Sequence, residues 1–346
     1  MPESVMVFSP SPQLTVTIEQ VGDEEEIHLH AGGQGVWVAR MIKSLGVRVV
    51  LCSAFGDETG RVVRNLILDE GLEVGAIDVA ARNGAYVHDR RDGTRNEIAQ
   101  APGQPLSRHD QDELYNVALA EGLRAEVAML AGVADPQVLP PDVYRRLAGD
   151  LRRNGTKVVA DLSGDYLTAV LEGGVDVLKV SHEEVLRDGR ATEETIPGLV
   201  AAMHRLREEG AGAVVLSRAE HPALVLIDDE VLQVELPRLE PADHRGAGDS
   251  MTAGVAAMLA RGRELEEAVR TGAAAGALNV TRHGLGTGRA DVIAQFTTRV
   301  ALTPLPGASA AAPRRPNSAA GTPPGAARGE GEALVTRSPH RRKEAR

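Results

Sequence analysis

The sequence predicts an α/β fold in which a central, mostly parallel sheet is flanked by helices. Short apolar runs alternate with amphipathic helical patterns through most of the 346 residues, and such alternation is typical of parallel strands joined by crossover helices. Aromatic residues make up only 2% of the chain, so the core must be built from Val, Leu, Ile and Ala. That composition suits a buried sheet covered on both faces.

Two segments near the start of the chain have a different pattern. Residues 13–30 and 84–99 alternate apolar and polar side chains with a period of two, as in LTVTIEQ and AYVHDRRDGTRNEIA. This period predicts strands with one solvated face, and the second segment contains an Asp92-Gly93 turn of the kind found in hairpins. We expect a small antiparallel lid sheet that projects from the main domain.

The main sheet is predicted from apolar runs that are too short for helices. We expect buried strands at residues 47–54, 127–132, 157–163, 175–181 and 213–217. Helical patterns lie between them, and two of these patterns, at 60–71 and 142–155, end at a glycine that can adopt the left-handed C-terminal conformation. Residues 1–302 are therefore assigned to one α/β domain that carries the lid.

The last part of the chain, residues 303–346, is rich in Pro, Ala, Gly and Arg and has almost no aliphatic periodicity. Such a segment cannot bury enough apolar surface to offset its ordering entropy, so we predict a disordered tail. Eight Arg and Lys against three Glu give the tail a charge of +5, which leaves −16 for the body out of a total of −11.

Charge and cysteine content exclude several classes of protein. An acidic body argues against nucleic acid as a general partner, and a single cysteine, Cys52, excludes an internal disulfide and a cysteine-based zinc site. The chain shows no secretory leader pattern and no apolar run of membrane-spanning length. We expect a cytoplasmic protein without a membrane partner, whose ligands are small molecules.

The stretch HRGAGDSMTAG, residues 244–254, places a carboxylate at the start of a predicted helix. Gly246 and Gly248 allow the backbone to approach a ligand closely, and the first N–H groups of a helix attract phosphate. Asp249 would repel that phosphate unless it serves a hydroxyl that attacks the phosphorus, as a general base. The alternative is that Asp249 is a helix N-cap, and the motif alone does not decide between them.

Two further stretches are candidates for ligand contact. AGGQGVWVARMIKSLG, residues 31–46, is either the backbone-lined wall of a pocket or a tight turn before a core helix, and it matches neither the dinucleotide fingerprint nor a P-loop. In LKVSHEEV, residues 178–185, Lys179 is placed to face a nucleotide phosphate and Glu184 to hold Mg²⁺ through water. The alternative for the second stretch is a solvated helix start.

Taken in order, these stretches resemble the PfkB/ribokinase family of carbohydrate kinases. The matching segments are AGGQGVWVAR, AFGDETG, DGTRNEIAQAPGQPLS, LKVSHEEV, RGAGDSMTAG and ALNVTRHGLGTG, within residues 5–296. They look closest to the branch of 1-phosphofructokinase and tagatose-6-phosphate kinase. The resemblance implies a ribokinase-like fold with a β lid, ATP as donor, Mg²⁺, and a sugar or sugar-phosphate acceptor, with the lid as a candidate dimer surface.

The resemblance also implies roles for individual residues. Asp249 is the general base, and the backbone amides of Gly246, Ala247 and Gly248 form an anion hole. The nucleotide side comprises Lys179, Ser181, Ser217 and Asn279, with Glu184 for the metal. The substrate side comprises Thr15, Gly32, Gly33, Gln34, Gly35, Trp37, Arg82 and Glu97.

Several of these positions depart from the family pattern. Gln34 stands where the family has Lys, Trp37 and Ser181 each stand where it has Asn, and Thr15 stands where it has Asp. Exchanging Lys for Gln removes a charge from a phosphate contact, an interaction worth about 1.5–3 kcal/mol. Trp37 offers a flat face to a sugar ring or a base, or fills space in a lid contact.

The resemblance leads us to expect an ATP-dependent kinase, with fructose 1-phosphate converted to fructose 1,6-bisphosphate as the first candidate reaction. Two alternatives stay open on the sequence. The departures at Thr15, Gln34, Trp37 and Ser181 allow a non-catalytic protein that binds a sugar phosphate or a nucleotide on a kinase scaffold. Stacking of a base on Trp37 would allow a nucleoside kinase of the same fold.

Overall fold

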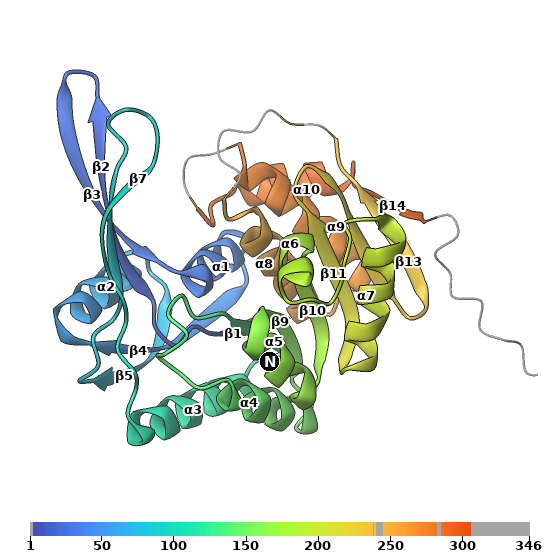
Figure 1. Cartoon of the computed structure of the whole chain (residues 1–346), viewed down its shortest axis with the longest axis horizontal. Helices are drawn as coiled ribbons and strands as arrows, with labels where there is room; N and C mark the ends of the chain where they lie inside the picture. Colours follow the sequence, from blue (N-terminus) through green and yellow to red (C-terminus); the bar gives the residue numbers. More distant parts are fainter. Residues whose placement is uncertain (1–2, 238, 240–244, 282–284, 306–346) are drawn as a thin grey trace, which may run out of the picture. The chain divides into compact units, whose positions relative to one another are not determined.

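The computed structural model describes residues 3–237, 239, 245–281 and 285–305 (Figure 1). All of them belong to one compact unit, Met1–Ala310. Residues 306–346, which include most of the predicted disordered tail, lie outside the described residues. None of the described helices is long and apolar enough to cross a membrane.

The main sheet has ten strands in the order β14-β13-β12-β11-β10-β9-β8-β1-β4-β5. The seven strands from β11 to β5 pair in parallel, and β12, β13 and β14 add to one edge in antiparallel fashion. The prediction of a mostly parallel sheet is therefore confirmed. The strand bounds are β1 (Ser4–Phe8), β4 (Arg48–Gly56), β5 (Glu73–Val79), β8 (Val127–Ala131), β9 (Lys157–Asp161), β10 (Val175–Ser181), β11 (Ala211–Arg218), β12 (His221–Ile227), β13 (Glu230–Glu235) and β14 (Ala301–Pro304).

Helices cover both faces of this sheet. Successive residues of a strand point to opposite faces, so a strand that is apolar throughout needs a helix layer on each side. In β1, Val5 and Val7 belong to one buried cluster while Met6 and Phe8 belong to the other. The Val5 face is covered by α1 (Gln34–Ser44), α2 (Asp57–Asp69), α8 (Ala247–Ala260), α9 (Leu265–Asn279) and α10 (Ala290–Thr297). The Met6 face is covered by α3 (Arg108–Gly122), α4 (Asp142–Arg153), α5 (Gly164–Gly173), α6 (His182–Arg187) and α7 (Ile196–Glu208).

A second sheet of four strands forms the lid, in the order β3-β2-β6-β7 (Figure 1). Its strands are β2 (Gln13–Val21), β3 (Glu24–Gly32), β6 (Ala85–Asp89) and β7 (Asn96–Ala101). Each of its two hairpins is antiparallel, as predicted, but β2 and β6 pair in parallel. The parallel pair arises because the hairpins come from separate parts of the chain and leave the main domain in the same direction.

Strand β14 changes one predicted boundary. The tail was expected to begin at residue 303, but Gln233 and Leu232 of β13 pair with Thr303 and Pro304. The pattern ALTP carries almost no periodic signal, so only its pairing with β13 identifies it as a strand.

Candidate active site

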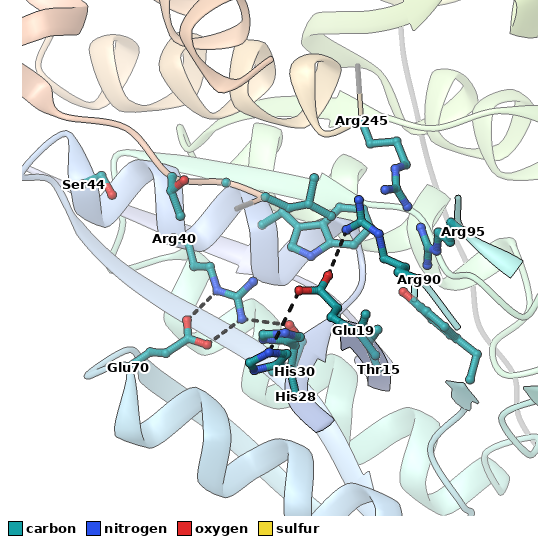
Figure 2. Close-up of a pocket in the computed structure, with 18 of the residues that line it drawn as sticks. Thr15, Glu19, His28, His30, Arg40, Ser44, Glu70, Arg90, Arg95 and Arg245 are labelled. Carbon is teal, nitrogen blue, oxygen red and sulfur yellow. Dashed lines mark hydrogen bonds and ion pairs between the residues drawn. The ribbon is translucent and has the colours of Figure 1, made fainter. Parts of the chain in front are cut away.

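A cleft of about 1130 Å³ lies between the lid and α1 (Figure 2). The lid contributes Thr15, His30 and Tyr86, and α1 contributes Trp37 and Arg40. The loops at either end of the α8–α9 pair close the cleft with Arg245 and with Leu285, Gly286 and Thr287. The cleft is thus formed by the lid, by the start of α1 with the predicted substrate loop, and by the loops before α8 and after α9.

Asp249 lies in the first turn of α8, just beyond the cleft. The N-cap of this helix is Gly246, at φ +71°, a left-handed conformation that favours glycine. Asp249 is the third residue of the helix and not its cap, so the N-cap alternative does not describe this aspartate. Among the described residues that line the cleft, Asp249 is absent, whereas Arg245 of the preceding turn is present.

Ionisable neighbours surround the half-buried Asp249 side chain. Burial raises its pKa to about 7, and the negative charges of Asp161 and Glu184 act in the same direction. The ammonium group of Lys179 and a hydrogen bond from Gln34 oppose this rise. A carboxylate with a pKa near neutral pH is suited to accept a proton.

Lys179 is held below the glycine-rich turn by its ion pair with Asp161. The two residues are paired in the register of β10 and β9, and Lys179 Nζ lies 3.2 Å from Asp161 Oδ2. A Cβ atom on Gly248 would come within 2.7 Å of Lys179 Nζ. This close approach explains the glycine at 248 and places a positive charge directly beneath the proposed anion hole.

The ion pair is itself anchored to α8. Thr252 donates from Oγ1 to Asp161 Oδ2 at 2.9 Å and lies 3.0 Å from the carbonyl oxygen of Gly248. Burial opposes the charge on Lys179, but Asp161, Glu184 and Asp249 outweigh it and raise the pKa of Lys179. Lys179 is therefore ionised. Asp161 was not among the predicted site residues, although it stands at the carboxyl end of a predicted buried strand, where functional groups of parallel sheets gather.

Of the predicted nucleotide-side residues, Asn279 and Lys179 lie at the glycine-rich turn. Asn279, at the end of α9, donates from Nδ2 to the carbonyl oxygen of Arg245 at 2.7 Å and accepts from the N–H of Gly286 at 3.0 Å. It thereby ties the loop before α8 to the loop after α9. Ser217 pairs with Ser181 at the carboxyl ends of β11 and β10.

Glu184 forms a capping box at the start of α6. Its Oε2 atom accepts hydrogen bonds from the N–H of Ser181 at 2.8 Å and from the Ser181 hydroxyl at 2.9 Å. The Ser181 side chain in turn caps the helix. In the described part of the chain, no group of three or more His, Cys, Asp or Glu could hold a metal ion by itself.

The predicted substrate loop forms one end of the cleft. Thr15 and Gly32 line it side by side, and a Cβ on Gly32 would come within 2.6 Å of Thr15 Oγ1. Gly33 is the N-cap of α1 at φ +107°, and a Cβ on Gly35 would collide with Ser9. The glycines at 32, 33 and 35 thus bring the backbone close to the lid and to β1.

Of the eight predicted substrate-side residues, Thr15, Gly32 and Trp37 line the cleft, whereas Gly33, Gln34, Gly35, Arg82 and Glu97 do not. The guanidinium of Arg82 donates to the carbonyl oxygen of Pro102 at 3.2 Å, and Glu97 is paired with His88 across the β6–β7 hairpin.

Arg90, Arg95 and Arg245 contribute positive charge to the cleft instead, and Figure 2 shows them gathered on one side of it. Arg90 lies 3.4 Å from Glu19, and Arg95 contacts His88 and lies over the ring of Tyr86. None of the three was among the predicted site residues. The clustering of Arg90, Arg91 and Arg95 around the hairpin turn was the available signal.

The sequence of this chain is similar to those of known carbohydrate kinases. The model of the family described as "pfkB family carbohydrate kinase" matches residues 8–291. A 1-phosphofructokinase of Bacillus subtilis is 27% identical over 277 residues, which cover 80% of this chain and 89% of that protein. An ATP-dependent 6-phosphofructokinase isozyme 2 of Mycobacterium tuberculosis is 29% identical over 303 residues, covering 84% of this chain and 87% of that protein.

A solved structure shares the fold. Phosphofructokinase-2 from Escherichia coli, in complex with potassium, superposes with a TM-score of 0.74 at 22% identity, covering 85% of this chain and 98% of that one. This likeness confirms the ribokinase-like α/β fold predicted from the sequence.

Proposed function

The chain belongs to the pfkB family of carbohydrate kinases, and we propose that it transfers the terminal phosphoryl group of ATP to a hydroxyl of a sugar phosphate. The observation that carries this proposal is the placement of Asp249 in the first turn of α8, next to the ionised Lys179. Fructose 1-phosphate is our first candidate acceptor. Relatives named for both 1- and 6-phosphofructokinase activity support fructose 6-phosphate as the second.

In the proposed reaction, Asp249 accepts the proton of the acceptor hydroxyl as its oxygen attacks the terminal phosphorus of ATP. The bond between that phosphorus and the bridging oxygen breaks, and ADP leaves with the electron pair. The amides of Gly246, Ala247 and Gly248 and the positive end of α8 stabilise the charge on the transferring group. A base whose pKa is about 7 takes up the proton without being fully protonated beforehand at neutral pH.

No group of three acidic or histidine side chains among the described residues could hold a metal ion by itself, so a magnesium ion would take most of its ligands from the ATP phosphates and water. Asp161, Glu184 and Asp249 all act on Lys179 electrostatically, so three carboxylates share one ammonium group and leave an excess of negative charge. Carboxylate oxygens and water are the ligands that Mg²⁺ prefers. Glu184 would hold the ion through water, and the ion would neutralise charge on the ATP phosphates.

The charges that line the cleft favour a phosphorylated acceptor over a nucleoside. Arg90, Arg95 and Arg245 all line the side shown in Figure 2, and guanidinium groups bind phosphate through paired N–H donors. We propose that the acceptor's phosphate binds there, while its ring lies against Trp37. These arginines would replace the phosphate contact that the family's Lys supplies at position 34.

The outer face of the lid supports a homodimer as the functional form. Ile27, Leu29 and Val21 of the first lid hairpin are 69%, 50% and 51% exposed. Ile27 and Leu29 stand beside Ile18 and Val16 in the register of β3 and β2, so they form a continuous apolar face. We propose that a second copy of the chain covers this face, because exposed apolar patches of this kind mark association sites.

The proposed activity is tested by measuring ADP release from ATP and Mg²⁺ with a panel of acceptors, for the wild type and Asp249→Asn in parallel. The panel is fructose 1-phosphate, fructose 6-phosphate, tagatose 6-phosphate, free hexoses, ribose and nucleosides. We expect turnover with one sugar phosphate and a loss of at least about 100-fold in the variant, since the base is removed while the binding groups stay. Equal turnover in both proteins would contradict the role of Asp249.

The same panel distinguishes the alternatives. Turnover with a nucleoside alone would support the nucleoside kinase and the stacking role of Trp37. Saturable binding of a sugar phosphate by calorimetry, with no ADP formed at any enzyme concentration, would support a non-catalytic binding protein.

A further inference from the structure

Arg95 contributes a positive charge to the cleft and contacts two rings of the lid. Arg90, in the same hairpin, lies 3.4 Å from the carboxylate of Glu19. Arg95 instead contacts the side chains of Tyr86 and His88 on β6, and no carboxylate of the described residues forms an ion pair with it. Its charge therefore remains available to a ligand in the cleft that it lines.

The ring of Tyr86 supports the guanidinium of Arg95. The guanidinium carbon lies 5.4 Å from the centre of the ring, which is a cation–π distance. Tyr86 pairs with Thr15 in the register of β6 and β2, and both residues line the cleft. The guanidinium is thus held over one wall of the cleft, on the side where Figure 2 shows Arg95.

His88 supplies the hydrogen bond that orients this guanidinium. Arginine carries only N–H donors, so the Nε2 atom of His88, which contacts Arg95 Nη2, is the acceptor. The imidazole is then neutral, with its proton on Nδ1. Burial lowers the pKa of His88 and the charge of Arg95 acts in the same direction, in agreement with a neutral ring. The rings of His88 and Tyr86 pack edge to face, with centroids 4.5 Å apart.

The burial of His88 has no explanation in the packing of the lid alone. The residue is only 6% exposed, and its Nδ1 atom has no hydrogen-bond partner in the described part of the chain. A buried donor without a partner destabilises a fold. Since the ring nevertheless bonds to Arg95, its position is explained if the orientation of that guanidinium matters for ligand binding.

The hairpin turn restrains the backbone around Arg95. Asp92 accepts hydrogen bonds from the N–H and the hydroxyl of Thr94 at 2.8 and 2.7 Å, and Asn96 donates to its other carboxylate oxygen at 3.1 Å. These bonds involve the residues on either side of Arg95 in the chain. Both ends of the arginine, its backbone and its guanidinium, are therefore held.

We propose that Tyr86 and His88 are positioning residues that aim Arg95 at the phosphate of the acceptor, and that Arg95 makes the site select phosphorylated sugars over free sugars. This inference rests on the proposed function and names the residues that determine its substrate class. A guanidinium held by uncharged partners keeps its attraction for an anion and loses little side-chain entropy when the anion binds. A phosphate that binds Arg90, by contrast, competes with Glu19.

The test measures binding by isothermal titration calorimetry, so that it does not depend on turnover. The ligands are the three sugar phosphates of the acceptor panel, free fructose and ADP, and the protein is the full chain. For Arg95→Gln we expect the Kd of the sugar phosphate that the wild type binds best to rise about 10- to 100-fold. The Kd for ADP should change less than about twofold, and free fructose should bind the wild type more weakly than that sugar phosphate does.

Two pairs of variants test the positioning role. Tyr86→Phe keeps the aromatic face and should stay within about twofold of the wild-type Kd, whereas Tyr86→Leu loses the cation–π contact and should raise the Kd about 3- to 10-fold. His88→Leu should raise it about 10-fold, and His88→Gln, which retains an acceptor oxygen, should raise it less. The thermal midpoint of His88→Leu should not fall, because this variant removes a buried donor without a partner.

The matched control is Arg146→Gln on α4. The Arg146 guanidinium lies 4.6 Å from the centre of the Tyr115 ring, and Arg146 is not among the residues that line the cleft. The control therefore loses the same charge and the same kind of contact, and every Kd should stay at its wild-type value. Circular dichroism checks folding. Because Arg95 is exposed, Arg95→Gln decides the question even where a variant of β6 does not fold.

Four results would overturn the proposal. They are a wild type that binds no sugar phosphate, free fructose that binds as tightly as the sugar phosphates, unchanged Kd values in folded Arg95→Gln, and a rise of equal size for ADP. Equal effects of Tyr86→Phe and Tyr86→Leu, or of the two His88 variants, would refute the positioning role. A wild type that binds a sugar phosphate but releases no ADP in the kinase assay would refute the proposed function instead, so the two failures are distinguishable.

Discussion

At the scale of single residues, the site is governed by the balance of charge around Asp249. Asp161, Glu184 and Asp249 share the ammonium group of Lys179, and the low polarity of the surroundings makes each of these charges depend on the others. Burial raises the pKa of Asp161, and its ion pair with Lys179 and its hydrogen bond from Thr252 oppose that rise. Burial and the charge of Asp161 raise the pKa of Asp249, the proposed base, to about 7.

This balance predicts how stability changes with pH. The pKa of Asp249 is raised from 3.8 to about 7 in the folded protein, so folding favours the protonated form. The stability that protonation of Asp249 contributes to the wild type is therefore lost as the pH rises from about 3.8 to about 7. Asp249→Asn does not titrate at this position, so its stability relative to the wild type should increase with pH. The difference in free energy of unfolding, variant minus wild type, should be larger at pH 8 than at pH 4.5 by about 1–3 kcal/mol.

The measurement is urea unfolding of both proteins at these two pH values. Asp291→Asn is the control, because the exposed Asp291 has its pKa lowered by Arg289 and should give a small difference of the opposite sign. An advantage of Asp249→Asn that is the same at both pH values would mean that the carboxylate has an ordinary pKa.

At the scale of elements, the site depends on how closely α8 and α9 approach. A Cβ on Gly254 would come within 2.6 Å of Gly272 Cα, and a Cβ on Gly272 within 2.5 Å of the carbonyl oxygen of Met251. Glycine is thus required at this crossing although it is a poor helix former. The packing matters for function because α8 carries Asp249 in its first turn and α9 carries Asn279 at its end.

Gly272→Ala should therefore destabilise the protein by about 1–3 kcal/mol through overpacking, in spite of the higher helix propensity of alanine. Turnover should also fall in this variant, because the start of α8 and the end of α9, which together hold the loop before Asp249, would move apart. Urea unfolding and the ADP assay measure these effects.

The control lies in another helix. Gly149 is in α4, where the nearest atom to an added Cβ is Arg153 Nη2 at 3.3 Å, the end of a flexible side chain. Gly149→Ala should be neutral or stabilising by up to about 1 kcal/mol. If both substitutions had the same effect, the close approach of α8 and α9 would not be the cause.

At the scale of the whole described domain, the lid has two faces with different tasks. One face carries Thr15 and His30 into the cleft, and the other exposes Ile27 and Leu29 to solvent. Because side chains alternate along a strand, a contact that covers the apolar face also restrains the strands that carry the cleft residues. The proposed dimer would therefore couple association to substrate binding.

Charges on the apolar face should separate the proposed dimer. We expect the wild type to show twice the chain mass in light scattering at micromolar concentration, and Ile27→Lys combined with Leu29→Lys to show the mass of one chain, since each lysine would be buried without a partner. Leu123→Lys, at a 44% exposed site at the end of α3, is the control and should stay dimeric. A monomeric wild type would contradict the dimer.

Local pattern was sufficient for much of this protein. The apolar runs that became β4, β8, β9, β10 and β11, the two lid hairpins and the glycine-rich turn with Asp249 were all predicted from the sequence, because period, glycine and charge within ten residues determine them. The strands β1, β5, β12, β13 and β14 of the main sheet were missed. β12 carries the apolar run ALVLI, so a local signal was available there, whereas β14 at the edge of the sheet is identified only by its pairing with β13.

The site itself was decided by tertiary structure. The ion pair of Lys179 with Asp161 follows from the register of two parallel strands, and the hydrogen bond from the N–H of Gly132 to Gln34 Oε1 joins the start of α1 to the residue after β8. Arg90 and Arg95 line the cleft where Arg82 was expected. A sequence determines which side chains are available and which elements form locally, whereas the direction in which a side chain points, and its partner, depend on contacts between segments far apart in the chain.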